Sequence, residues 1–248
     1  MQQFGWLNFN HRFHIFELIA VGLVAMAATL TLGIATMPSP PRDSRTAVYQ
    51  IKIKSNGKLL PVPFAPPSED SKQLFRGGGN SLVARTVGHA EGTRSANGEK
   101  TTAYSGHRDP GNAVWNLGYF SYQHSAVSPE DADRKQLARL ERQFVVIEEQ
   151  ARKRGIDLSI EEKLNAIDLA NQAPLAALEP GGFIDQLKEC KRELVCVRSQ
   201  SFVDNDTGRL DAPGLGNNMN QVRADQKRRI DAINSAFTMM MKPSSSQK

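Results

Sequence analysis

An uncharged run near the N-terminus constrains this chain more than any other feature of its sequence. Residues 18–37 read LIAVGLVAMAATLTLGIATM. As a helix, this run would be about 30 Å long, which matches the hydrocarbon thickness of a bilayer. Helices buried in a globular core seldom run that far without a polar face. The run therefore predicts one membrane-spanning helix.

The same run has two readings as a targeting segment. A cleaved signal peptide has a shorter apolar core, of about 7–15 residues, followed by a small-residue cleavage site. Here the run is longer and no clear A-x-A site follows it, which favours an uncleaved signal-anchor. Arg12 precedes the run, flanked by His11 and His14, and this slight basic character favours an N-terminus that stays in the cytoplasm.

The charge balance narrows the range of partners. The chain of 248 residues carries a net charge of +5, and its first 37 residues contribute only Arg12 and Glu17, so the remainder keeps the same balance. A mild positive charge suits a polyanionic surface such as a cell wall. No basic stripe is interleaved with aromatic residues, so nucleic acid is not an expected partner.

The two cysteines leave two alternatives open. Cys190 and Cys196 are six residues apart, which does not match a zinc site or a redox C-x-x-C motif. In an oxidising compartment the pair could form a disulfide. On one continuous helix, however, the two Cα atoms would be too far apart for a bridge, and two small buried thiols are the alternative.

The remaining pattern predicts an α+β fold that is mainly α. Residues 38–79 are expected to form an extended linker with a possible β-hairpin around Asn56-Gly57. Residues 80–240 are expected to form the compact domain, and residues 241–248 a disordered tail. Helices are predicted over 81–91, 129–154, 160–171, 182–194 and 217–237, from periodicity and capping residues, with short strands and loops over 93–127.

Two acids stand out in the polar stretch GHAEGTRSANGEKTTAYSGHRDPGN. Glu91 lies at the C-terminal end of a largely apolar helix. The negative end of the helix dipole and apolar neighbours both favour the protonated acid, which is the form that a general acid needs. Asp109 follows 18 residues later, beyond a plausible hairpin. A glycosidase needs such a pair, one acid to protonate the leaving oxygen and a second carboxylate across the cleft.

These elements together resemble the lysozyme superfamily. A helix ending in A-E-G-T, a polar hairpin, the run G-H-R-D-P-G-N and the aromatic run W-N-L-G-Y-F-S-Y-Q follow one another over residues 80–200. This arrangement is similar to that of phage endolysins, lytic transglycosylases and chitosanases. The resemblance implies a lysozyme-like helical domain with a small β-hairpin region beside a cleft, and cleavage of peptidoglycan or a related amino-sugar polymer. It also implies a bacterial inner-membrane protein whose C-terminal domain lies in the periplasm or cell-wall space.

The resemblance assigns roles to particular residues. Glu91 would donate the proton, and Asp109 is the candidate second acid. The expected substrate-binding residues are Thr93, Thr101, Thr102, Tyr104, His107, Asn112, Tyr122 and Gln123. The aromatic faces of Trp115, Tyr119 and Tyr122 are suited to packing on pyranose rings, but Trp115 and Phe120 are expected in the core. Both muramidase and lytic transglycosylase chemistry remain open. A muramidase would use Asp109 as the second acid, whereas in a lytic transglycosylase one acid, Glu91, would serve twice.

The same sequence allows a second class of function, a membrane-anchored protein without catalytic activity that binds glycan or a protein partner through the same cleft. A Glu91 held in a structural salt bridge would favour this reading. No cofactor and no metal site are predicted. The spacings of His89, His107 and His124 match no short metal motif, and residues 204–208 are expected to form an Asx turn rather than a calcium loop.

Overall fold

The computed structural model describes residues 52–55, 58–61, 68–109 and 113–242. The predicted membrane-spanning run 18–37, Asn112 and the end of the tail lie outside these residues. Within the described part of the chain, no helix is both long enough and apolar enough to cross a bilayer. The fold is mainly helical, with two small two-stranded sheets.

The first sheet is the hairpin predicted around Asn56-Gly57. Strands β1 (Lys52–Ser55) and β2 (Lys58–Pro61) pair antiparallel, with Ser55 opposite Lys58. The two strands are separated by the Asn-Gly pair, which suits a two-residue hairpin turn because both residues tolerate positive φ.

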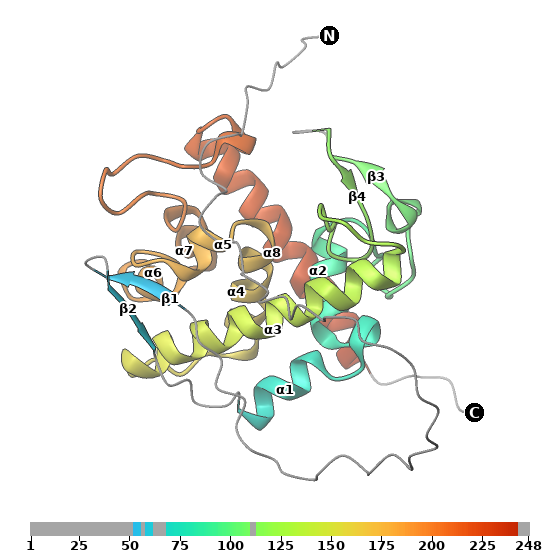
Figure 1. Ribbon diagram of the computed structural model, residues 1–248, viewed down its shortest axis with the longest axis horizontal. Helices are drawn as coiled ribbons and strands as arrows, with labels where there is room; N and C mark the ends of the chain where they lie inside the picture. Colours follow the sequence, from blue (N-terminus) through green and yellow to red (C-terminus); the bar gives the residue numbers. More distant parts are fainter. Residues whose placement is uncertain (1–51, 56–57, 62–67, 110–112, 243–248) are drawn as a thin grey trace, which may run out of the picture. The chain divides into compact units, whose positions relative to one another are not determined.

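The helical body follows from residue 68 onward, and Figure 1 shows its elements in order. Its helices and strands are α1 (Glu69–Phe75), η2 (Gly78–Asn80), α2 (Leu82–Ala90), η3 (Thr102–Ser105), β3 (His107–Arg108), β4 (Trp115–Asn116), α3 (Pro129–Lys153), α4 (Ile160–Gln172), α5 (Pro174–Leu178), α6 (Phe183–Glu189), α7 (Leu194–Gln200), η4 (Pro213–Leu215) and α8 (Met219–Met241).

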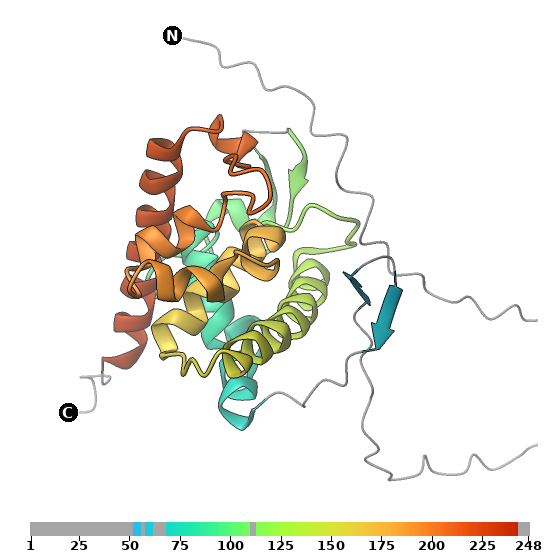
Figure 2. The same cartoon turned by 90° about the vertical axis from the view of Figure 1, so that its left-hand side faces the viewer.

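Helix α2 lies inside this body. It packs against α8, α4 and α1, and Val83, Ala84, Val87 and Ala90 are fully buried. Figure 2 shows α8 on one side and α3 on the other, with α2 and the helices of residues 160–200 between them. The residue that ends α2 is therefore held between long helices rather than on a mobile surface loop.

Local capping signals place several helices where the sequence predicts them. Ser81 caps α2, and Ser128 caps α3 with a proline at its first turn. Ser159 and Glu162 form the reciprocal capping box that begins α4. Each cap satisfies backbone N–H groups that would otherwise have no partner at a helix start.

The body begins earlier than the predicted boundary at residue 80. Helix α1 lies in the segment assigned to the linker, yet Leu74 and Phe75 are 5% and 8% exposed and belong to the core. The predicted helix over 182–194 is also too long. It ends at Glu189, since Lys191 and Arg192 take positive φ values of 49° and 66° and turn the chain into α7.

This turn decides between the two alternatives for the cysteines. Cys190 and Cys196 form a disulfide, and their Cα atoms are 5.7 Å apart. A continuous helix would have kept them apart, but the break after α6 folds α7 back toward the end of α6. The bridge joins two helices that meet at the turn.

Truncating the core at Phe144 tests this packing. The Phe144 side chain is 1% exposed, and its ring lies 6.1 Å from that of Phe75 in α1. We expect Phe144→Ala to lower the free energy of unfolding by about 3–5 kcal/mol, since it leaves a cavity between α1 and α3. Urea unfolding measures the loss. Val127→Ala, at a side chain that is 93% exposed, should change it little, and equal effects would contradict the packing described.

Candidate functional site

The end of helix α2 places Glu91. The Ser81 hydroxyl accepts a hydrogen bond from the Ala84 amide at 3.1 Å and fixes the start of the helix. The Glu91 amide donates to the Val87 carbonyl at 2.8 Å, and Gly92 leaves the helix with a φ of 75°. Glu91 is thus the capping residue of α2, as its position before glycine predicts.

One oxygen of the Glu91 carboxylate is held by two donors. Arg229 Nη2 lies 2.5 Å from Oε1, and Asn171 Nδ2 donates to the same atom at 2.9 Å. The side chain is 14% exposed. Within the described part of the chain, no donor contacts Oε2. The carboxylate is therefore anchored through Oε1 by side chains of α4 and α8.

Arg229 belongs to a buried network of alternating charges. Its guanidinium contacts both oxygens of Asp168, at 2.8 Å each, and Asp168 also accepts from Arg198 Nη2 at 2.6 Å. The side chains of Asp168 and Arg198 are completely buried, and that of Arg229 is 5% exposed. The order Glu91, Arg229, Asp168, Arg198 joins α2, α8, α4 and α7.

Burial and ion pairing shift the pKa values of these side chains in opposite directions. Burial alone would raise the pKa of Asp168, but Arg229 and Arg198 outweigh it and hold that pKa below its usual range. Burial would lower the pKa of Arg229, but Asp168 and Glu91 hold it well above the ordinary value. Burial lowers the pKa of Arg198, an effect that Asp168 opposes. Asp168 and the two arginines therefore depend on one another for charge compensation.

Neutral side chains complete the hydrogen bonding of Arg198. Its Nε donates to Gln226 Oε1 at 2.7 Å, and its Nη1 donates to the backbone and side-chain oxygens of Asn165 at 2.9 and 3.1 Å. Gln226 and Asn165 are themselves fully buried. A buried guanidinium with its donors satisfied can act as a rigid support rather than a source of strain.

Removing the central acid should break the whole network. Asp168→Ala leaves Arg198 and Arg229 buried without their shared partner, and we expect it to cost about 3–5 kcal/mol of unfolding free energy. Chemical denaturation measures the loss. The matched control is Asp231→Ala, which removes the exposed pair with Lys227 and should cost little. A small effect at Asp168 would show that the network does not hold the helices together.

The second predicted acid lies on the small hairpin beside α2. Strands β3 and β4 pair His107 with Asn116 and Arg108 with Trp115, and Asp109 follows directly after β3. Gln123 Nε2 donates to Asp109 Oδ2 at 3.3 Å. The structure thus brings together two of the predicted site residues, Asp109 and Gln123.

One turn links this hairpin to Glu91. The Phe120 carbonyl accepts from Asn171 Nδ2 at 3.2 Å, and the same amide nitrogen holds Glu91. Leu117 and Tyr122 form an antiparallel β-bridge across this turn, and Gln123 follows directly after it. Phe120 is 2% exposed, as expected for a core residue.

Two residues predicted to bind substrate are buried and have hydrogen-bond partners within the domain. Thr93 is completely buried and donates to the carbonyls of Gly88 and Tyr119. Tyr104 is 4% exposed, and its hydroxyl donates to Glu130 at 2.9 Å. Their polarity reflects backbone and carboxylate partners inside the domain, which sequence alone cannot distinguish from a cleft.

The other predicted residues keep some exposure. Thr101 donates to the carbonyl of Gly92, next to Glu91, at 2.8 Å. His107 Nδ1 lies 3.0 Å from the Ala103 carbonyl, and Tyr122 packs edge-on against His124 with ring centroids 5.1 Å apart. Thr102 is exposed. These residues remain candidates for ligand contacts.

The expectation that Trp115 is a core residue is wrong. Its side chain is 53% exposed. Successive side chains of a strand point to opposite faces, and on β4 it is Asn116, 2% exposed, that points inward.

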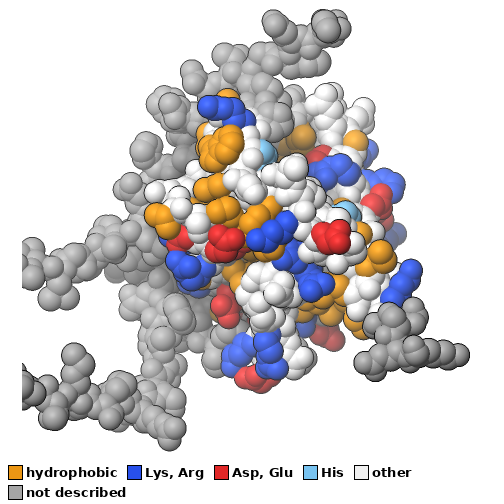
Figure 3. Space-filling view, turned by 90° about the vertical axis from the view of Figure 1, so that its right-hand side faces the viewer, with side chains coloured by type: hydrophobic (Ala, Val, Ile, Leu, Met, Phe, Trp, Pro, Cys, Tyr) orange, Lys and Arg blue, Asp and Glu red, His pale blue; other side chains and the backbone are white. Residues whose placement is uncertain are grey.

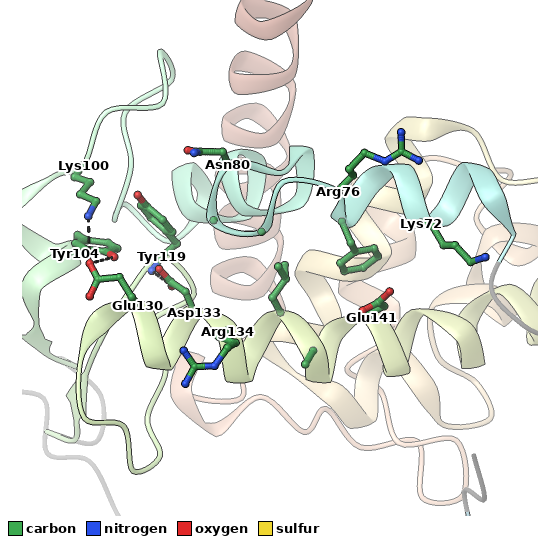
Figure 4. Close-up of a pocket in the computed structure, with 15 residues that line it drawn as sticks. Lys72, Arg76, Asn80, Lys100, Tyr104, Tyr119, Glu130, Asp133, Arg134 and Glu141 are labelled. Atoms are coloured by element: carbon green, nitrogen blue, oxygen red, sulfur yellow. Dashed lines mark hydrogen bonds and ion pairs between the residues drawn. The ribbon is translucent and has the colours of Figure 1, made fainter. Parts of the chain in front are cut away.

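A hollow of about 730 Å³ lies elsewhere, between α1, η2 and α3. Figure 4 shows Lys100, Tyr104, Tyr119, Glu130 and Asp133 at one end of it. Lys72, Arg76 and Glu141 lie at the other end. Glu91 is not among the lining residues. This hollow is thus separate from the acid that the sequence singles out.

Asp133 in this hollow makes a pH-dependent contribution to stability. Burial raises its pKa to about 6, although the Tyr119 amide donates to the carboxyl at 2.6 Å. Because the folded pKa is the higher one, the stabilising contribution is present below about pH 4 and is lost as pH rises through about 6. We expect the wild type to lose stability relative to Asp133→Asn between these values, as measured by urea unfolding. A difference that does not change with pH would contradict this.

Sequence reasoning missed the residues that hold Glu91. Asn171, Asp168, Arg198 and Arg229 lie on predicted helices or next to them, but none is part of a local motif. The available signal was indirect, since charged residues at positions of a helix that face the core are rarely buried without a partner.

The described residues include no group of three or more histidine, cysteine, aspartate or glutamate side chains placed to hold a metal ion. Residues 204–208 form an Asx turn, in which Asp204 Oδ1 accepts from the amides of Asp206 and Thr207. Comparison with protein-family models, curated proteins and solved structures finds no match to this chain.

Proposed function

We propose that this protein is a membrane-anchored enzyme that cleaves glycosidic bonds in peptidoglycan or a related amino-sugar polymer, with Glu91 as the proton donor. The observation that supports this most is the way the carboxyl group is held. Arg229 and Asn171 fix Oε1, and no described donor contacts Oε2. A general acid needs both a fixed orientation and one oxygen within reach of the leaving group.

The buried network gives this acid a rigid support. Glycoside cleavage requires the proton donor to face the bridging oxygen throughout the reaction. Arg229 is fixed by two hydrogen bonds to Asp168, which Arg198 fixes in turn. Glu91 thus rests on side chains that cannot change rotamer without exposing buried charge.

Arg229 and Asn171 also act after the proton has left Glu91. After the proton passes to the bridging oxygen, Arg229 and Asn171 stabilise the carboxylate that remains.

Asp109 is the proposed partner in the second half of the reaction. Its contact with Gln123 holds the carboxyl on the hairpin, and the turn of Phe120 joins that hairpin to Asn171. Asp109 would position water for hydrolysis. If the substrate's own groups complete the reaction instead, the products would be those of a lytic transglycosylase.

The same ion pair is the observation that favours the second candidate function. A glutamate paired with a buried arginine can be purely structural, and the domain would then bind glycan or a protein partner without cleaving anything. The disulfide suits an exported domain under either function, since such bridges persist in oxidising compartments.

Fragment release distinguishes the two functions. The full chain, purified in a mild detergent, is incubated with purified peptidoglycan and separately with chitosan. We expect wild-type protein to release soluble fragments and Glu91→Gln to lose at least about a hundredfold of that rate, since general acid catalysis contributes about 10²–10⁴-fold.

Glu99→Gln is the matched control, because Glu99 is an exposed glutamate on the same polar loop. It should keep full activity. The ends of the fragments separate hydrolysis from transglycosylation. No release by folded wild-type protein from either polymer would overturn the enzyme and favour the binding protein.

A further inference from the structure

Trp115 is the most exposed aromatic side chain of the described residues. It lies on β4 with 53% of its surface exposed, while the next residue, Asn116, is 2% exposed. A large aromatic ring left this open on a two-residue strand contributes little to the core.

The indole is seated against the backbone of Gly106. A Cβ atom added to Gly106 would lie 2.4 Å from Trp115 Cζ2 and 2.8 Å from Nε1, and Gly106 itself has a φ of 132°. Only glycine allows both the close approach and this backbone conformation. The ring is therefore held in place on one side while remaining exposed on the other.

The surroundings of the ring are polar rather than apolar. Arg108 Nη1 donates to the Ala113 carbonyl at 3.0 Å, and the contact between Gln123 and Asp109 lies just beyond the end of β3. Figure 3 shows the side on which Figure 1 places β3 and β4, where apolar side chains are interspersed with acidic, basic and other polar ones.

This combination fits a sugar better than a protein partner. A pyranose ring presents a flat face of C–H groups that packs on an aromatic ring, and hydroxyls at its edge that need polar neighbours. A protein interface would instead surround an aromatic anchor with further contacts that exclude water. Here Val114, 38% exposed, is the adjacent apolar side chain.

We infer that Trp115 is a stacking platform for a pyranose ring of an amino-sugar polymer, and that packing on the Gly106 backbone orients the indole. The inference rests on the proposed function, of which it names a substrate-binding residue. Trp115 would bind sugar whether or not Glu91 cleaves it, so the stacking platform and the proposed catalytic activity can be disproved separately.

Tryptophan fluorescence reports on this ring directly. The chain has two tryptophans, so the substitution Trp6→Phe leaves Trp115 as the only one. Glu91→Gln is added to this variant to prevent cleavage of the ligand during the titration. The full chain in detergent is titrated with the β-1,4-linked tetramer of N-acetylglucosamine. We expect a blue shift of the emission and protection from acrylamide quenching.

Calorimetry with single variants separates stacking from general apolar contact. Trp115→Ala should weaken binding of the tetramer by about tenfold. Trp115→Phe should recover part of this, because it keeps a flat ring, and Trp115→Leu should recover none. Gly106→Ala should weaken binding as well, by displacing the indole. Thermal unfolding checks that each variant is folded.

The outcomes separate the platform from the enzyme. Unchanged emission and unchanged affinity of Trp115→Ala, with fragment release by the wild type intact, would overturn the platform alone. Stacking without any fragment release would support the platform and overturn catalysis. An affinity restored equally by leucine and phenylalanine would show apolar contact without stacking and would also overturn the platform.

Discussion

The contact between Arg229 and Asp168 is the interaction on which the rest of the structure depends. It is bidentate, buried, and shared with Arg198 on one side and Glu91 on the other. Four helices from distant parts of the chain meet at these side chains. Buried ion pairs are weak evidence for stability in themselves, because desolvation offsets much of their attraction. Removing one partner is nonetheless costly, because it leaves the other charges buried without compensation.

Sequence and structure agree wherever the signal is local. The caps at Ser81, Ser128 and Ser159 and the pairing of β1 with β2 each depend on residues that are close in the sequence, and all were predictable. The position of Glu91 at the end of α2 follows from the same reasoning. Helix α1 was missed because its seven residues are too few to show a clear period.

The candidate site was less predictable because its contacts are long-range. Arg229 is 138 residues from Glu91, and Asn171 is 80 residues away. Thr93 and Tyr104 are polar residue types that are common in a binding cleft, but both are buried and bonded to partners within the domain. Trp115 was expected in the core and is exposed. Polarity shows that a side chain needs a partner. It does not show whether that partner is the protein or a ligand.

The most direct test of the central claim is a crystal structure of the Glu91→Gln chain with a bound amino-sugar oligomer. The account predicts sugar rings along the β3–β4 hairpin, with a glycosidic oxygen within hydrogen-bond distance of the side chain at position 91 and with Arg229 still paired to Asp168. An oligomer bound only in the hollow between α1 and α3, or a side chain at position 91 that contacts no sugar, would contradict it.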